Sequence, residues 1–301
     1  MTNVHLDSSD SDDARRRRLY EGDIYLYSPT KPALELVAFA REMIGETFGE
    51  RNPELAQFDM PVTEYAALLA ELKPKFIHHP TCKRLLPEIL KALGCEPTQT
   101  FFDVPRLRSS TSDNFLTTGI AYAFHPHRDT WYSAPMCQIN WWLPVFRLSP
   151  DNAMAFHPAY WANGVRNSSN GYNYQRWNKE ARFIAANQIG TDTRAQPQAL
   201  EPIQMDDDLR LAPPPGGIIV FSGAQLHSSV RNMSGRTRFS IDFRTVNGED
   251  AAALRGARNV DSECTGSTMY DYLRCTDLAH LPEATLQLYE AGPPQSALLR
   301  A

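Results

Sequence analysis

Two histidines and one aspartate place the strongest constraint on how this chain can fold. His127 and Asp129 are separated by one residue, as H-x-D, and His227 follows much further along the chain. Two neutral imidazoles and one carboxylate can hold one face of an octahedral ferrous ion and leave the opposite face open. We therefore expect a fold that brings the segment around His227 alongside the H-x-D segment.

Alternation of residue types predicts β-strands in the segments that carry these residues. If the run AYAFHPHRDTWY is a strand, His127 and Asp129 point to the same side of it. His227 follows an apolar stretch, residues 218–221, that also has the character of a strand. In TRFSIDFRTV, polar and apolar residues alternate with period two, which is typical of a strand with one polar face. That polar face consists of Arg238, Ser240, Asp242 and Arg244.

The polar face beside the metal strand is suited to a carboxylate ligand. Arginine offers a flat, bidentate fork for a carboxylate, and serine adds a hydroxyl donor. We predict that Arg238 and Ser240 bind the far carboxylate of 2-oxoglutarate. Arg236 and Arg244 have the same parity on this strand and are the competing candidates.

The segment from about His125 to Val246 resembles the phytanoyl-CoA dioxygenase-like branch of the Fe(II)/2-oxoglutarate-dependent oxygenases. The matching pieces, in order, are HRD at 127–129, DNAMAFHP at 151–158, PGG at 215–217, HSSVRN at 227–232, and Arg238. Gly217 stands where that branch usually has an acidic residue. The resemblance implies a mainly β fold with flanking helices, built on a double-stranded β-helix core of the jelly-roll or cupin-like kind. It also implies that His127, Asp129 and His227 hold Fe(II), with 2-oxoglutarate and O2 as cosubstrates.

The resemblance further implies a dioxygenase that couples oxidative decarboxylation of 2-oxoglutarate to hydroxylation of a small organic metabolite. The carboxylate of Asp129 argues against the halogenase relatives, which lack it. Desaturation, cyclisation and epimerisation stay open as alternative outcomes. Two other classes are also open. One is a non-enzymatic jelly-roll module that binds a sugar or metabolite, and the other is a cupin-type metalloenzyme that uses His125 and no 2-oxoglutarate.

Further candidate ligand contacts flank the metal set. The stretch CQINWWLPVF is predicted to be a strand with Gln138, Asn140 and Trp142 on one face, so the two amides can reach 2-oxoglutarate or substrate. An insert at 160–208 is rich in Asn, Gly and aromatic residues and is predicted to act as a partly mobile lid. The predicted substrate contacts are His125, Trp131, Trp142, Tyr174 and Trp177.

The 301 residues are enough for one large domain. We expect a disordered tail over 1–18 and a single domain over 19–301. Within that domain, the sequence predicts a helical part at 19–100, a β core at about 101–248 interrupted by the insert, and a helical segment at 249–301. Helices are predicted over 32–48, 62–77 and 83–93, because apolar residues recur there near helical spacing.

Composition excludes several classes of partner. The net charge of −5 argues against a nucleic-acid-binding protein, which usually has a basic surplus. No stretch approaches the roughly 18 apolar residues that a membrane span requires, and the N-terminal residues lack an apolar signal core. The five cysteines have no C-x-x-C spacing, which favours reduced thiols. We therefore expect a cytoplasmic protein with a small-molecule substrate.

Overall fold

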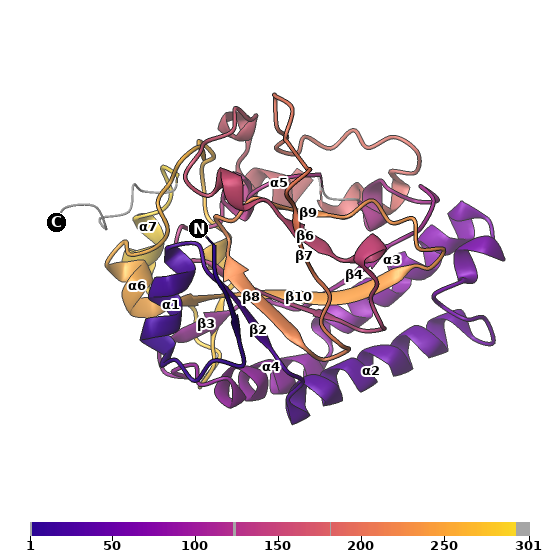
Figure 1. Ribbon diagram of the computed structural model, residues 1–301, viewed down its shortest axis with the longest axis horizontal. Coiled ribbons are helices and arrows are strands. Elements are labelled where there is room, and N and C mark those ends of the chain that lie inside the picture. The colour runs from indigo at the N-terminus through magenta and orange to yellow at the C-terminus, as the bar shows by residue number, and fades with distance from the viewer. Residues whose placement is uncertain (1, 123–124, 181, 293–301) are drawn as a thin grey trace.

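Two β-sheets form the centre of the computed structural model, which describes residues 2–122, 125–180 and 182–292 (Figure 1). The large sheet has the strand order β1-β2-β8-β5-β10-β3-β11, with β4 also paired to β10. The small sheet has the order β7-β6-β9. The strands are β1 (Val4–Leu6), β2 (Ile24–Tyr27), β3 (Thr100–Phe102), β4 (Arg106–Ser110), β5 (Ile139–Pro144), β6 (Met154–Phe156), β7 (Leu209–Leu211), β8 (Ile218–Ser222), β9 (His227–Ser229), β10 (Arg238–Asn247) and β11 (Leu273–Arg274).

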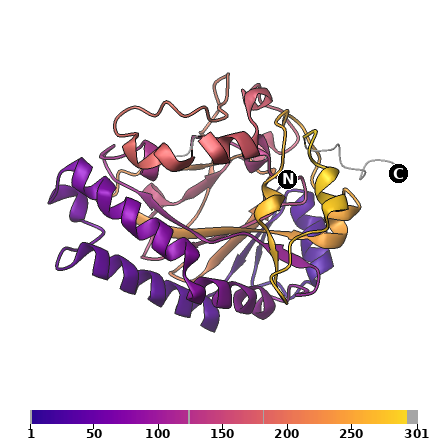
Figure 2. The same cartoon turned by 180° about the vertical axis from the view of Figure 1, so that it is seen from behind.

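Three helices cover one face of the large sheet, and the small sheet lies over its other face (Figures 1 and 2). The helices are α2 (Lys31–Phe48), α3 (Val62–His78) and α4 (Pro80–Ala92). Their buried apolar residues share one core with Trp141, Val220 and Phe243 from the large sheet. A second core between the sheets contains Trp142, Phe156 and other apolar residues. The three predicted helices are confirmed, and α4 begins three residues earlier than its prediction because Pro80 occupies its first turn.

Strand β10 is the longest strand and shows the predicted alternation. Phe239, Ile241 and Phe243 are buried in the core beneath the helices. Strand β10 pairs with β5 on one side and with β4 and β3 on the other, so its backbone is hydrogen-bonded along both edges. Its polar residues therefore point into the space between the two sheets, where they line a cavity.

The N-terminal residues differ from the predicted disordered tail. Strand β1 pairs in parallel with β2, and helix α1 (Asp12–Tyr20) packs beside the large sheet. Arg16 is buried and its Nε lies 2.6 Å from Asp250 Oδ2. Acidic residues in the first turn of α1 and arginines in its last turn also complement the helix dipole. The charge of Arg16, which the sequence pattern assigned to a solvated tail, is thus neutralised by a partner within the fold.

Other segments also depart from their predictions. The H-x-D run is not a strand: His127 forms a single bridge, and Asp129 begins a 3-10 helix, η3 (Asp129–Tyr132). Pro126 explains this, because proline lacks an amide donor and restricts the residue before it. Helix exceeds strand, at 35% against 19%, so the fold is mixed rather than mainly β. The C-terminal segment has only short helices within its described residues, α6 (Gly248–Ala252), η8 (Thr268–Asp271) and α7 (Glu283–Gln287).

The remaining helices are short. Those in the insert are η5 (Pro158–Tyr160), η6 (Ser169–Gly171), α5 (Tyr174–Glu180) and η7 (Arg182–Asn187). Elsewhere the chain forms η1 (Ala56–Phe58), η2 (Gly119–Ala121) and η4 (Pro150–Asn152). Within the described residues, no helix has the length and apolar character needed to cross a bilayer.

Asp250→Ala should destabilise the protein strongly. The Asp250 carboxylate accepts hydrogen bonds from Arg16, Tyr20 and Arg255 at 2.6–2.9 Å. Removing one partner of a buried ion pair leaves a charge uncompensated and costs about 3–5 kcal/mol. Urea denaturation should show this loss in the free energy of unfolding. The control is Asp13→Ala, whose side chain is 56% exposed and which should cost less than about 1 kcal/mol. Equal losses in the two variants would show that α1 is not anchored through Asp250.

Candidate active site

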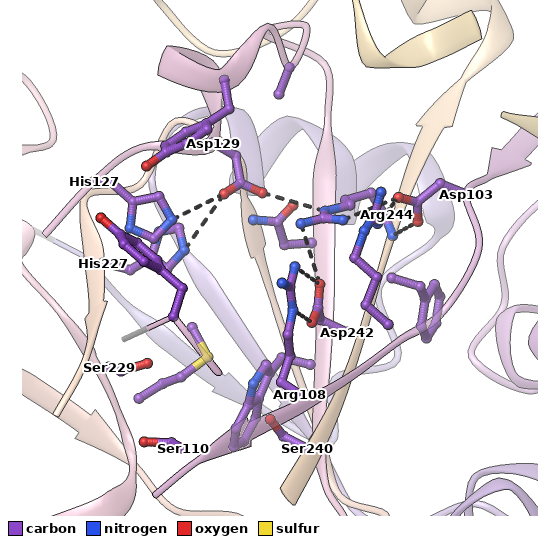
Figure 3. Close-up of a pocket in the computed structure, with 18 of the residues that line it drawn as sticks. Asp103, Arg108, Ser110, His127, Asp129, His227, Ser229, Ser240, Asp242 and Arg244 are labelled. Carbon is purple, nitrogen blue, oxygen red and sulfur yellow. Dashed lines mark hydrogen bonds and ion pairs between the residues drawn. The ribbon is translucent and has the colours of Figure 1, made fainter. Parts of the chain in front are cut away.

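His127, Asp129 and His227 form a compact cluster between the two sheets (Figure 3). One ligand atom from each residue lies within 4.8 Å of the others. Asp129 Oδ1 is 3.5 Å from His127 Nε2 and 3.8 Å from His227 Nε2. The cluster depends on the backbone, because His127 and His227 each donate their amide to the other's carbonyl at 3.0 Å. The structure thus brings together the three residues that the sequence pattern selected.

Backbone carbonyls orient both imidazoles. His127 Nδ1 lies 2.8 Å from the carbonyl oxygen of His125, and His227 Nδ1 lies 3.0 Å from that of Gln225. A carbonyl can only accept, so each Nδ1 carries the proton and each Nε2 presents its lone pair. Two imidazole lone pairs and one carboxylate oxygen therefore converge on one point, and this donor set fits Fe(II).

The electrostatics of the cluster favour the protonation states that a cation needs. Burial lowers the pKa of His227 to about 3, and the neighbouring His127 adds to the effect. Burial opposes ionisation of Asp129, but the two imidazoles and the Asn140 amide that face its carboxylate outweigh this effect and lower its pKa to about 2. At neutral pH, a neutral His227 therefore faces an ionised Asp129.

Gln138 holds the second oxygen of the aspartate. Its Nε2 donates to Asp129 Oδ2 at 3.0 Å and to Asn140 Oδ1 at 2.9 Å. Its Oε1 accepts from the Tyr272 hydroxyl at 2.7 Å. Arg244 Nε lies 3.6 Å from the same Asp129 Oδ2, which leaves Oδ1 to face the histidines. Gln138 therefore positions Asp129, and because it also lines the cavity, its predicted contact with cosubstrate or substrate stays a prediction. Asn140 also lines the cavity and keeps its predicted candidacy.

We call the three candidate ligands His127, Asp129 and His227 the metal cluster. A cavity of about 230 Å³ connects this cluster to Arg238. The guanidinium donates to the carbonyls of Asn152 and Ala153 at 2.9 and 3.1 Å and to Ser229 Oγ at 3.2 Å. Its Nε is buried and has no hydrogen-bond partner in the described part of the chain, and the same holds for Ser240 Oγ. No carboxylate among the described residues lies within salt-bridge distance of Arg238. Burial lowers the pKa of Arg238 to about 10, so it remains charged at neutral pH.

The structure separates the three arginines that compete for the carboxylate role. Arg236 has an exposed side chain and lies 3.6 Å from Glu54. Arg244 lies 3.2 Å from Asp103 and 3.3 Å from Asp242. Arg238 alone of the three has no acidic partner among the described residues, so it is the one that needs an anion.

The predicted substrate contacts fall into two groups. Trp142, Tyr174 and Trp177 line the cavity. Trp131 does not, because it is fully buried and its Nε1 donates to Asp261 Oδ1 at 2.8 Å. The His125 side chain is exposed and lies outside both the metal cluster and the cavity lining, and only its carbonyl serves the site. The predictions for Trp131 and for the His125 side chain are therefore not supported.

Sequence reasoning missed three cations that line the cavity. Arg106 and Arg108 come from β4, and Lys73 comes from α3. Burial and then the charge of Arg108 lower the pKa of Lys73 to about 7. The alternation in RLRSS at 106–110 indicates that both arginines share one face. What the sequence does not show is that β4 pairs with β10 and so turns this face toward the metal.

Comparisons with known proteins reveal only distant likeness. No family model and no curated protein matches the chain. Among solved structures, EvdO2 from Micromonospora carbonacea var. aurantiaca has 13% identity and a TM-score of 0.46, covering 79% of this chain and 92% of its own. The non-heme monooxygenase ThoJ has 11% identity and a TM-score of 0.40, with 89% and 84% covered. The alpha-ketoglutarate-dependent epimerase SnoN has 12% identity and a TM-score of 0.37, with 79% and 84% covered.

His227→Ala should abolish tight binding of Fe(II), because two ligands cannot replace a facial set of three. Anaerobic titration calorimetry with Fe(II) measures this directly. The matched control is His125→Ala, which removes a neighbouring imidazole that lies outside the cluster. Its Fe(II) affinity should stay within about twofold of the parent chain, well below the tenfold or greater change typical of altering a ligand's hydrogen-bond partner. If His125→Ala lost the metal and His227→Ala retained it, the assigned ligand set would be wrong.

Gln138→Leu should weaken Fe(II) binding roughly 10- to 100-fold, the usual consequence of removing a group that orients a metal ligand. The substitution deletes the hydrogen bond to Asp129 Oδ2 and keeps a similar volume. Thr268→Val is the control, because its hydroxyl makes only a 3.4 Å contact with Gln138 Oε1. Unchanged affinity in Gln138→Leu would exclude a positioning role.

Proposed function

We propose that this protein is an Fe(II)- and 2-oxoglutarate-dependent oxygenase that hydroxylates a small organic molecule. One observation carries the proposal: the metal cluster and the unpaired, buried Arg238 line the same cavity. A buried arginine without a carboxylate partner is costly unless a ligand supplies the anion. A dicarboxylate that bridges the metal and Arg238 meets this requirement. The two facing sheets agree with the jelly-roll core that the sequence resemblance implies.

Each residue has a definite task in this proposal. His127, Asp129 and His227 hold the metal through two Nε2 atoms and Oδ1. Arg238 binds the far carboxylate through its unpaired Nε, with a hydroxyl contribution from Ser240. When bound, iron, 2-oxoglutarate and O2 together supply the oxidising chemistry. The chain contributes position and the exclusion of water, since the metal ligands and Arg238 are largely buried.

Observations on Arg238 and His125 disfavour the cupin-type rival. In a cupin-type metalloenzyme without 2-oxoglutarate, the unpaired Nε of Arg238 would have no ligand to bind. It would also need His125, whose side chain lies outside the cluster. A non-enzymatic binding module remains the outcome if no turnover is found. Product analysis distinguishes hydroxylation from desaturation, cyclisation and epimerisation, because only hydroxylation adds an oxygen atom.

Arg238→Met should raise the 2-oxoglutarate concentration required for substrate-independent succinate formation. Truncating one partner of a buried, hydrogen-bonded charge pair costs about 2–5 kcal/mol, which corresponds to roughly 30-fold or more in affinity. Fe(II) affinity should change little, because Arg238 does not contact the metal cluster.

The matched control for this experiment is Arg236→Met, which lies two residues earlier with an exposed side chain. It should leave the 2-oxoglutarate requirement unchanged. A larger defect in Arg236→Met than in Arg238→Met would contradict the assignment. Absence of succinate from the parent chain loaded with Fe(II) would favour the binding module.

A further inference from the structure

The cavity extends past the metal cluster along a row of aromatic rings. The ring centroids of His127 and Tyr132 are 5.5 Å apart, those of Tyr132 and Tyr172 are 5.4 Å apart, and those of Tyr172 and Trp177 are 6.5 Å apart. Tyr132, Tyr172, Tyr174 and Trp177 all line the cavity, and we call them the aromatic wall. This wall leads from a metal ligand to the insert.

Two tyrosines of the aromatic wall have hydroxyl groups that are already bonded to the protein. The Tyr132 hydroxyl donates to the carbonyl of Pro197 at 3.0 Å. The Tyr174 hydroxyl donates to the carboxylate of Asp271. Because these two hydroxyl groups already have protein partners, Tyr132 and Tyr174 offer a ligand mainly apolar ring surface, which is suited to a flat or cyclic body.

A second wall of the same cavity is cationic and consists of Lys73, Arg106 and Arg108. The register of β4 with β10 places Arg108 opposite Ser240 and Arg106 opposite Asp242, which continues the row that begins at Arg238. The neighbouring carboxylates are already engaged. Asp242 lies 2.7 Å from Arg108 and 3.3 Å from Arg244, and Arg244 also pairs with Asp103 (Figure 3). Asp103 forms a second ion pair with Arg106.

Lys73 lacks an acidic partner of its own. Its ammonium group donates to the carbonyl of Ile120, and no carboxylate among the described residues lies within salt-bridge distance. The described lining residues include five cations and three carboxylates when Lys73 is charged. Fe(II) and 2-oxoglutarate carry opposite charges of equal size, so their binding does not remove this positive surplus. A bound carboxylate would reduce this surplus and favour the charged form of Lys73.

Two buried donors in the cavity lining point to the same kind of ligand. Trp177 Nε1 and Gln196 Nε2 are buried and have no hydrogen-bond partner among the residues that the structure describes. Leaving a buried donor without a hydrogen bond is energetically costly, so such donors are typical of sites that a ligand completes. Both belong to the insert, and Trp177 is also part of the aromatic wall.

We propose that the substrate is a small organic acid with a cyclic body, bound with its ring against the aromatic wall and its carboxylate toward Lys73. The inference rests on the proposed function for one point, that the carbon to be oxidised lies near the metal cluster. The size of the cavity, about 230 Å³ shared with the cosubstrate, limits the body to one or two rings. The insert thus contributes to substrate choice through Trp177 and Gln196.

The test is a calorimetric comparison of 2-naphthoate with 2-naphthamide, which share a ring system and differ in charge. The protein is loaded with Fe(II) and saturating 2-oxoglutarate under anaerobic conditions. We expect the acid to bind at least tenfold more tightly than the amide, the scale of one hydrogen bond to a charged group. Equal affinities, or no binding of either probe, would overturn the proposal.

Substitutions locate the subsite. Lys73→Met should weaken naphthoate binding roughly tenfold and leave naphthamide binding unchanged. Lys75→Met is the matched control, because this lysine belongs to the same helix, has a 62% exposed side chain and pairs with Glu71. Trp177→Leu should weaken both probes, since it removes ring surface. An equal effect of Lys73→Met and Lys75→Met on naphthoate binding would overturn the assignment.

Arg238→Met distinguishes failure of this inference from failure of the proposed function. If 2-oxoglutarate does not occupy the Arg238 corner, naphthoate can bind there, and Arg238→Met rather than Lys73→Met abolishes its binding. That result would overturn the subsite. If Lys73→Met alone weakens naphthoate binding, the subsite stands even where no succinate is formed and the proposed function fails.

Discussion

Strand β10 imposes the constraint on which the rest of the site depends. Both of its edges are hydrogen-bonded to other strands, and its apolar face is buried under the helices. Its polar face must therefore find compensation inside the protein, because an unpaired charge in such a place is costly. Arg244 and Asp242 obtain it from each other and from Asp103 and Arg108. Arg238 has no acidic partner among the described residues, so the polar face of β10 presents one uncompensated positive charge to the cavity.

Local sequence patterns were sufficient to predict the helices and strands in which apolar residues recur with a single period along the whole element. The alternation in TRFSIDFRTV predicted β10 and its polar face correctly, and helical spacing predicted α2 and α3. The metal set was predicted for a partly wrong reason. Asp129 reaches the histidines from a 3-10 turn rather than from a strand, because Pro126 prevents regular pairing before it. The residue types at that spacing were informative even though the assumed backbone geometry was not.

The remaining features depend on contacts between residues far apart in the chain. Arg16 and Asp250 are separated by 234 positions, so the arginine run looks solvated until the fold places the aspartate beside it. Lys73 likewise joins the cavity only because α3 packs against β4. Alternation was enough to place Gln138 on the correct face of its strand. It could not predict the hydrogen bond to Asp129, because side-chain partners depend on the register with neighbouring segments.

Each metal-site imidazole is fixed by a carbonyl two positions before it in the chain, at His125 and at Gln225. A main-chain oxygen is present whatever side chain the residue carries, so these two hydrogen bonds to the imidazoles do not depend on which residues occupy positions 125 and 225. At 225 the side chain is committed elsewhere, since it donates to the carbonyl of Gly22. At 125 it is exposed, which makes this position a natural attachment point for a spectroscopic label that reports on the metal without disturbing its ligands.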